Sequence, residues 1–165
     1  MRAKSPYLLA LLCGLLPTMM LAAEVTLTPL SPLDLSYIEQ QSQGIDELAA
    51  RRLGRHLRGD LSDLALLQTI LDRQLIKEDD EAGLQALGIV LGGVLASEHA
   101  LEWVIYRDSQ GRSRALSIGR GKQCLFPATM IARRARVGQT VDVRAIYASA
   151  GETIKKVRSS GVRPY

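Results

Sequence analysis

The sequence predicts an α+β domain in which a helical N-terminal half packs on a small antiparallel sheet of about three strands, followed by two C-terminal helices. Two observations support this prediction. Residues 31–98 carry apolar side chains at helical spacing, whereas residues 101–126 form alternating apolar and polar runs around two turns. Helices grouped before strands, without regular alternation of the two, are typical of an α+β fold.

The first 23 residues have the pattern of a secretory signal peptide. Arg2 and Lys4 give a positive start, residues 7–16 form an apolar core, and the small residues Ala22 and Ala23 end the segment. The core is shorter than the roughly 20 residues that a membrane-spanning helix needs. We therefore expect cleavage, a periplasmic or secreted mature protein and no integral membrane span; a retained N-terminal anchor is the alternative. The expected organisation is a signal peptide at 1–23, a single α+β domain at 24–158 and a flexible tail at 159–165.

The mature domain begins with a short alternating stretch, residues 24–30, which indicates an edge strand or an extended lead-in. A helix is expected directly after it. Ser31 suits the cap position and Pro32 the first helical position. Leu30 and Leu35 are spaced to pack across this cap as a hydrophobic staple.

Two more helices are expected before the sheet. Asp60 can cap the second helix, whose apolar face is formed by leucines 64, 67, 71 and 75. The third helix, residues 81–98, is apolar nearly all round, which indicates a central buried position. Its small residues Gly88, Gly92 and Ala96 repeat every four positions. Such a stripe lets another backbone approach closely, and we expect the following sheet to pack there.

The strands are predicted around two turns. Residues 101–119 form two β runs joined by a turn with Asp108 at its first position and Gly111 at its last. Gly119–Gly121 then turns the chain into a third run, residues 122–126.

Two helices complete the expected domain. Pro127 suits the first position of the fourth helix, which ends at Gly138. The start of the final segment fits either a strand or a helix, but its helical apolar set is longer, and so we expect a helix over about residues 141–158. The outward side of the fourth helix carries Arg133, Arg134 and Arg136.

Sites for phosphate, nucleophilic catalysis or metal are not predicted. Gly121-Lys122 is followed by glutamine and not by the hydroxyl residue of a phosphate-binding loop. Cys124, the one cysteine of the expected mature chain, lies beside large apolar residues, which raise the pKa of a thiol and make it inert. His56 and His99 show no ligand spacing with it. We therefore expect no catalytic residue, no metal ligand and no cofactor.

The charge is divided between the two halves of the mature chain. Residues 24–98 hold six Lys or Arg against thirteen Asp or Glu, a net charge of −7, whereas residues 99–165 hold thirteen against four, a net charge of +9. One reading is mutual screening within a compact domain, with the three arginines on a solvated helix face. The other is that Arg133, Arg134 and Arg136 bind an anionic envelope component or an acidic protein. Nucleic acid is not expected as a partner, because the chain has one Trp, one Phe and no recognition motif.

The middle of the chain resembles the bacterial family known only as domain of unknown function 3806. The resemblance lies in three segments, "LQALGIVLGGVLA", "LEWVIYRDSQGRSRAL" and "LFPATMIARRARVGQTVDV", within about residues 80–146. Trp103 together with Phe126-Pro127 is its most distinctive part. The resemblance implies one α+β domain and carries over no catalytic residues.

From these observations we expect an exported, non-enzymatic interaction module with its contact surface at the three arginines. An envelope hydrolase acting on peptidoglycan, glycan or peptide is the first alternative, because paired carboxylates or His99 could meet in a cleft. A chaperone-like or structural helper with an apolar groove beside Gly88 and Gly92 is the second. The sequence leaves the oligomeric state open.

Overall fold

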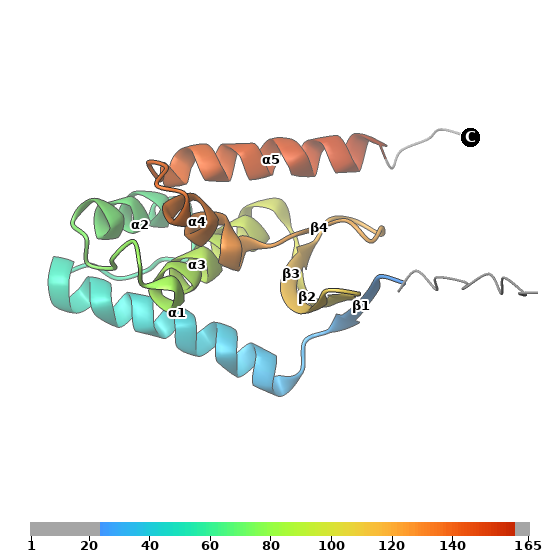
Figure 1. Ribbon diagram of the computed structural model, residues 1–165, viewed down its shortest axis with the longest axis horizontal. Helices are drawn as coiled ribbons and strands as arrows, with labels where there is room; N and C mark the ends of the chain where they lie inside the picture. Colours follow the sequence, from blue (N-terminus) through green and yellow to red (C-terminus); the bar gives the residue numbers. More distant parts are fainter. Residues whose placement is uncertain (1–23, 161–165) are drawn as a thin grey trace, which may run out of the picture.

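The computed structural model describes residues 24–160, and the predicted signal peptide and residues 161–165 lie outside this part of the chain. In chain order the elements are β1 (Thr26–Pro29), α1 (Pro32–Leu53), α2 (Asp63–Asp72), α3 (Glu81–His99), β2 (Glu102–Asp108), β3 (Gly111–Ser117), β4 (Cys124–Leu125), α4 (Pro127–Arg136) and α5 (Val143–Ser160) (Figure 1). They confirm the predicted α+β fold, with helices first, a small antiparallel sheet and two C-terminal helices.

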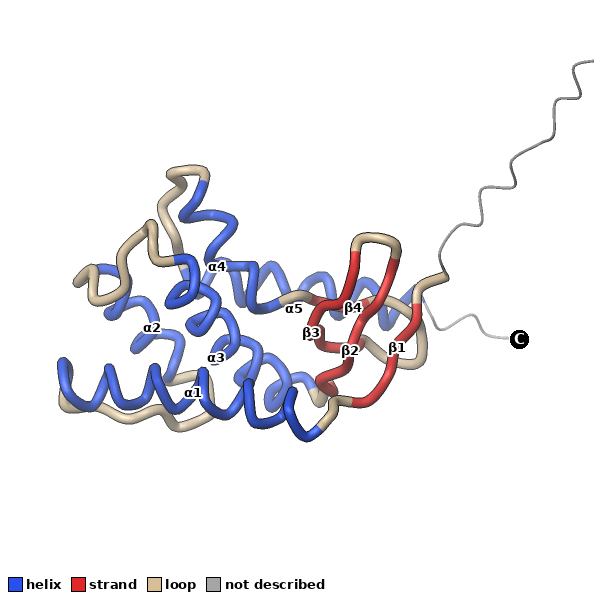
Figure 2. Tube along the Cα trace, turned by 60° about the horizontal axis from the view of Figure 1, so that its bottom comes forward, coloured by secondary structure: helices blue, strands red, loops and turns tan. Residues whose placement is uncertain are grey.

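The sheet has four strands in the order β1-β2-β3-β4, and every neighbouring pair is antiparallel. The strand beyond the expected three is β1, which pairs with β2 so that Leu27 lies opposite Tyr106. The turn between β2 and β3 lies where the sequence predicts it, because Asp108 and Gly111 face each other at the ends of the two strands. Figure 2 shows the four strands gathered at one end of the molecule, where the C-terminal end of α5 also lies.

The start of α1 is fixed by a reciprocal cap. The Asp34 amide donates to Ser31 Oγ at 3.3 Å, and the Ser31 amide donates to Asp34 Oδ2 at 3.1 Å. This capping box satisfies two backbone donors that a helix start leaves free. The cap therefore forms as predicted. The Leu35 side chain, which was expected to pack against Leu30 as a hydrophobic staple, is 56% exposed.

Helix α3 is the centre of the hydrophobic core and lies between α1 and α5 (Figure 1). Ten of its residues are buried, which confirms the position that its apolar circumference predicts. No helix within residues 24–160 is long and apolar enough to cross a membrane.

The small-residue stripe of α3 has one partner more than expected. A Cβ on Gly88 would collide with the backbone of Pro127 and Ala128 at the start of α4, and a Cβ on Gly92 would lie 2.5 Å from the Trp103 ring. The sheet thus contributes one side chain, and the close backbone belongs to α4. The expected contact with the sheet is therefore present through Trp103 of β2, and the start of α4 is a second close neighbour that was not expected. Both glycines are buried, so the groove expected beside them is filled.

The last two helices confirm the sequence interpretation. Helix α4 begins at Pro127 and turns Ile131 and Ala135 inward. The ambiguous final segment is helical, and α5 extends through Ser160, two residues beyond the expected end. Gln68 of α2 fixes the start of α5, because its amide oxygen accepts the Val143 amide at 2.9 Å.

Candidate functional site

The three arginines of α4 have different surroundings. Arg133 is exposed. Arg134 is half-buried and donates from Nη1 to the Met130 carbonyl of its own helix at 2.8 Å. Arg136 places Nη2 2.7 Å from Oε1 of Glu81, the first residue of α3. Among residues 24–160, the cluster therefore contains one guanidinium without an ion pair, one engaged with the backbone and one paired with a carboxylate.

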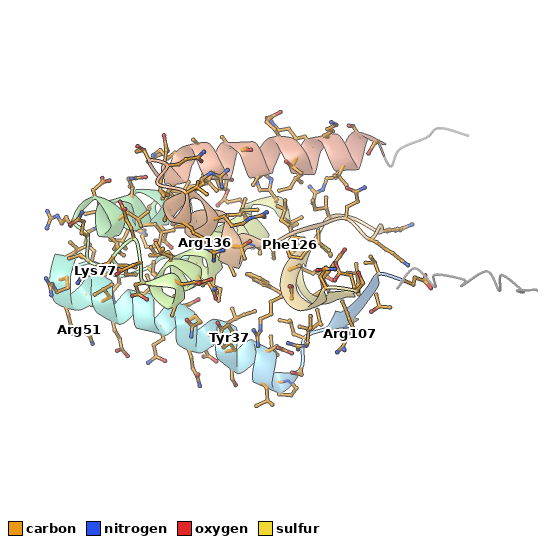
Figure 3. All side chains as sticks on the ribbon, viewed as in Figure 1. Tyr37, Arg51, Lys77, Arg107, Phe126 and Arg136 are labelled. Carbon is orange, nitrogen blue, oxygen red and sulfur yellow. The ribbon has the colours of Figure 1, made fainter. Side chains whose placement is uncertain are left out.

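A hollow of about 340 Å³ lies between α4, the start of α3 and β3, and we call it the α4 hollow. Its lining includes Glu81, Gln85, Ser113, Phe126, Arg133 and Arg136. Arg134 is not part of this lining. Figure 3 shows Arg136 on α4 and Phe126 at the start of that helix, both near the middle of the molecule.

The Phe126 ring is held by a second aromatic side chain. Its centroid lies 5.1 Å from that of Tyr106 at an interplanar angle of 85°, an edge-to-face contact. Phe126 follows β4 directly and is the cap residue of α4. The aromatic part of the hollow is therefore anchored to the sheet, while its cations come from the helix.

Glu81 is held inside the α4 hollow by two donors on one oxygen. Its Oε1 accepts from Arg136 at 2.7 Å and from Gln85 Nε2 at 3.2 Å. The side chains of Glu81 and Arg136 are 59% and 63% exposed. An exposed pair of this kind contributes less than about 1 kcal/mol to stability. The hollow thus contains a guanidinium and an amide donor, from Arg136 and Gln85. Their contacts with the Glu81 carboxylate add little to the stability of the fold.

A second cluster of charges joins α1 to the sheet, and the sequence analysis did not identify it. Asp34, with its side chain only 3% exposed, accepts a hydrogen bond from Arg112 at 2.5 Å and forms an ion pair with Arg114 at 2.9 Å. The Arg114 guanidinium also stacks over the Tyr37 ring, 3.9 Å from its centroid. The hydrogen bond from Arg112, followed by that from Ser31, holds the pKa of Asp34 well below its usual range.

This Asp34 cluster is a structural connection. Its carboxylate is already satisfied by Ser31 and by two arginines, so it offers no free acceptor. The available sequence signal was the placement of Arg112 and Arg114 on the same face of a strand, since side chains two residues apart share a face.

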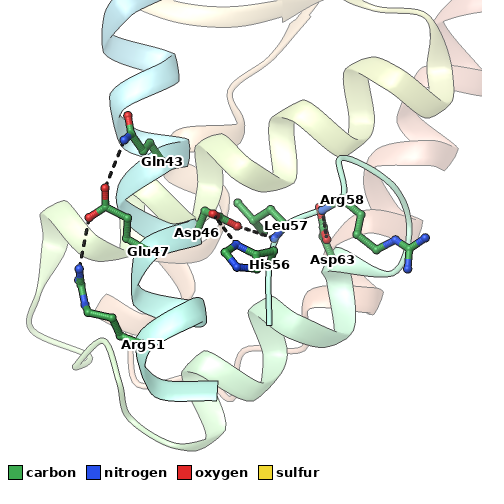
Figure 4. A network of polar contacts seen from close by, with 8 residues as sticks. All are labelled: Gln43, Asp46, Glu47, Arg51, His56, Leu57, Arg58 and Asp63. Atoms are coloured by element: carbon green, nitrogen blue, oxygen red, sulfur yellow. Dashed lines mark hydrogen bonds and ion pairs between the residues drawn. The ribbon is translucent and has the colours of Figure 1, made fainter. Parts of the chain in front are cut away.

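His56 belongs to a network that fixes the loop between α1 and α2 (Figure 4). Its Nδ1 lies 2.9 Å from Asp46 Oδ2, and the Leu57 amide donates to the other oxygen of Asp46 at 2.6 Å. The hydrogen bond with His56 lowers the pKa of Asp46. Nearby, Asp63 accepts the amides of Arg58 and Gly59. In this loop, side-chain carboxylates accept the backbone N–H groups that a helix or strand would otherwise pair.

Cys124 and His99 have separate surroundings. Cys124 lies on β4 opposite Ser117, is half-buried, and burial raises the pKa of its thiol. His99 ends α3 and stacks beside Tyr147 of α5, with 5.6 Å between ring centroids. Within residues 24–160 no group of three or more His, Cys, Asp or Glu side chains is placed to hold a metal ion.

The glycine-rich segment before Cys124 is a tight turn. Gly119 has a φ of 68°, in the left-handed region that favours glycine. The Ile118 amide donates to the Gln123 carbonyl at 2.9 Å and closes the connection between β3 and β4. The segment therefore serves strand pairing.

Comparison with known proteins identifies a family and one related fold. A crystal structure from Bacteroides thetaiotaomicron VPI-5482 is similar at a TM-score of 0.71 with 19% sequence identity, over 78% of this chain and 48% of that one. The chain thus spans about half the length of that protein, and the likeness concerns the fold alone. No curated protein matches the sequence. The family described as "Domain of unknown function (DUF3806)" matches residues 63–147, more than half of the chain and including most of the segment on which the resemblance rests. The chain therefore belongs to the DUF3806 family.

Proposed function

We propose that the chain is an exported, non-enzymatic binding module that docks an anionic partner of the cell envelope on the outer face of α4. Arg133, Arg134 and Arg136 form the contact surface. The observation that carries the proposal is the α4 hollow, where two of these guanidiniums meet an amide, a hydroxyl and an aromatic ring. Arg133 takes part in none of the ion pairs found among residues 24–160.

The chemistry of the hollow suits binding. A guanidinium stays protonated at every physiological pH and presents a planar set of donors that matches a carboxylate or a phosphate. It attracts an anion but does not exchange protons with it. Arg134 adds positive charge at longer range, and the net charge of +9 in residues 99–165 favours the approach of an anionic partner.

Export is part of the proposal and rests on residues 1–23. Their positive start, apolar core and small-residue end are typical of a cleaved signal peptide. The mature chain then keeps a single cysteine, so no internal disulfide can form.

An envelope hydrolase is the second candidate, and one cleft favours it. Asp72 of α2 and Glu78 of the following loop both line a cleft of about 270 Å³ beside the loop that joins α4 to α5. Two carboxylates facing one cleft are the arrangement that glycoside hydrolysis uses. Hydrolysis of purified peptidoglycan by the wild-type chain, lost in Asp72→Asn, would favour this candidate over a binding module.

A chaperone-like helper is a third candidate. It rests on a different groove from the one expected beside Gly88 and Gly92. An apolar groove of about 540 Å³ lies between β1, β2 and the start of α1, with Trp103 and Leu35 in its lining. Leu35 of this lining is 56% exposed. Exposed apolar side chains at a sheet edge are typical of contact surfaces.

The binding proposal is tested with defined anionic probes. These are lipopolysaccharide, vesicles of phosphatidylglycerol with phosphatidylethanolamine, and a fluorescent acidic peptide in which Glu alternates with Leu. We expect the mature wild-type chain to bind at least one probe, more weakly as salt screens the charges. The double variant Arg133→Glu/Arg136→Glu should lose binding and keep its melting temperature, because both side chains are exposed.

Arg51→Glu/Arg52→Glu is the matched control. Both are exposed arginines in the last turn of α1 and neither lines the hollow, so their reversal changes the net charge by the same amount without changing the site. Equal loss of binding in the control and in the double variant would refute the site, and a wild-type chain that binds no anionic probe would refute the function.

A further inference from the structure

The α4 hollow already contains a carboxylate, and this identifies what it accepts. We infer that Glu81 occupies the position that a carboxylate of the partner takes on binding, and that the partner is therefore an acidic protein segment. This inference rests on the proposed function. It adds the chemical class of the partner and an internal competitor for the site.

The contacts of Glu81 define the anion position. Arg136 and Gln85 both donate to the same oxygen of Glu81, at 2.7 Å and 3.2 Å. A charged and an amide donor converging on one carboxylate oxygen form a site for a planar carboxylate. Arg133 lines the same hollow and provides a second guanidinium for that group, one that takes part in none of the ion pairs among residues 24–160.

Glu81 can leave this position easily. More than half of its side chain and of the Arg136 side chain is exposed, and exposed ion pairs add little to stability because water solvates both partners nearly as well. A displaced Glu81 side chain can therefore turn into solvent at the first turn of α3. An incoming carboxylate then recovers both donors and gains Arg133.

The charges around the hollow favour a single carboxylate over an anionic surface. Glu78, Asp79 and Asp80 precede Glu81 directly and are all exposed. A membrane or lipopolysaccharide layer laid across α4 would bring many phosphates near this acidic run, which repels them. The run repels the carboxylates of a peptide as well, but a short acidic segment can place one carboxylate beside the two arginines and direct its others away from the run, which a continuous anionic surface cannot do.

The size and the floor of the hollow agree with a peptide side chain. Its volume of about 340 Å³ admits a side chain and adjoining backbone. The Phe126 ring in its lining supplies an apolar contact, and the Ser113 hydroxyl and the Gln85 amide supply polar contacts that a peptide backbone can use.

The test compares Glu81→Gln with Asp79→Asn, using fluorescence anisotropy of the labelled Glu-Leu peptide and of its Gln-Leu counterpart. Both variants remove one negative charge from the same acidic run, but only Glu81 contacts Arg136. We expect Glu81→Gln to bind the Glu-Leu peptide about fivefold more tightly than wild type, because the competing ion pair is gone. Asp79→Asn should change the affinity by less than about twofold, and the Gln-Leu peptide should bind neither variant. Glu81→Ala provides a second variant with the same expectation.

The outcomes separate this inference from the function beneath it. Equal affinities of Glu81→Gln and Asp79→Asn would overturn the competitor role. Binding of vesicles or lipopolysaccharide, but not of the Glu-Leu peptide, would overturn the partner class while the anion-binding function stands. A wild-type chain that binds none of these probes would remove the proposed function and this inference together.

Discussion

Asp34 is the residue that connects the two halves of the fold. It caps α1 through Ser31 and accepts two arginines of β3 while almost fully buried. Its ionised form is therefore matched in the folded chain by the Ser31 donors and by two guanidiniums. Such a carboxylate is satisfied in the folded chain and loses these partners on unfolding, which links it to stability and to pH.

Replacing Asp34 tests this role at the scale of one residue. Asp34→Asn keeps the size of the side chain but leaves Arg112 and Arg114 without their charged partner, and we expect a loss of about 2 kcal/mol in the free energy of unfolding. Urea denaturation at neutral pH measures this loss. Glu39→Gln is the control, because Glu39 is exposed on the same helix and should change stability by less than about 0.5 kcal/mol.

The same variant should flatten the acid limb of the stability curve. Because the folded pKa of Asp34 is lowered, its contribution is fully present above the unfolded pKa of about 3.9 and is lost as pH falls from there toward the folded pKa. The wild-type chain should therefore lose more stability than Asp34→Asn below about pH 4. Parallel curves for the two chains would contradict the link.

The glycines of helix α3 differ in the space around them. Gly88 and Gly92 face α4 and Trp103 at distances that leave no room for a Cβ, whereas nothing lies within 4 Å of a Cβ on Gly93. Three neighbouring glycines of one helix thus have two different roles. The first two allow close packing, and the third only lowers helix propensity.

Alanine substitutions separate these roles. Gly88→Ala should destabilise the chain by about 2–3 kcal/mol, because the neighbour that must move is backbone. Gly92→Ala should do so as well, through the Trp103 ring. Gly93→Ala should stabilise by about 0.5–1 kcal/mol, since it removes the entropy cost of glycine without a collision. Thermal unfolding of the three variants measures the contrast, and a uniform effect would contradict it.

Local signals predicted the elements, and contacts across the chain decided their partners. The capping box at Ser31, the turn at Asp108, the proline start of α4 and the helical period of α5 all act within a few residues, and each is where the sequence places it. The partner of the small-residue stripe is set by the path of the chain through Phe126-Pro127, which no local pattern specifies. Likewise, pairing of β1 with β2 joins residues far apart in the sequence.

The candidate site was predictable only in part for the same reason. The arginines of α4 are visible in the sequence, but their roles depend on neighbours. Glu81 reaches Arg136 across 55 positions, and Arg134 turns to its own helix. No spacing within α4 distinguishes the free guanidinium of Arg133 from these two.

The whole molecule combines an acidic half and a basic half that meet at specific points. Within residues 24–160, three ion-pair sites cross between them: Asp34 with the arginines of β3, Glu81 with Arg136 and Glu24 with Lys122. Mutual screening therefore accounts for part of the divided charge. Arg133 and Arg120 are among the exposed cations of residues 24–160 that take part in none of these pairs. Of these two, only Arg133 lines the α4 hollow with a second arginine.

An NMR titration of the mature, isotope-labelled chain with the Glu-Leu peptide tests most directly whether the α4 hollow binds an acidic segment. We predict that amide shifts change at the start of α3, along α4 and at Ser113, and that these changes vanish in Arg133→Glu/Arg136→Glu. Shift changes confined to the apolar groove between β1 and α1, or to the cleft that holds Asp72 and Glu78, would contradict it.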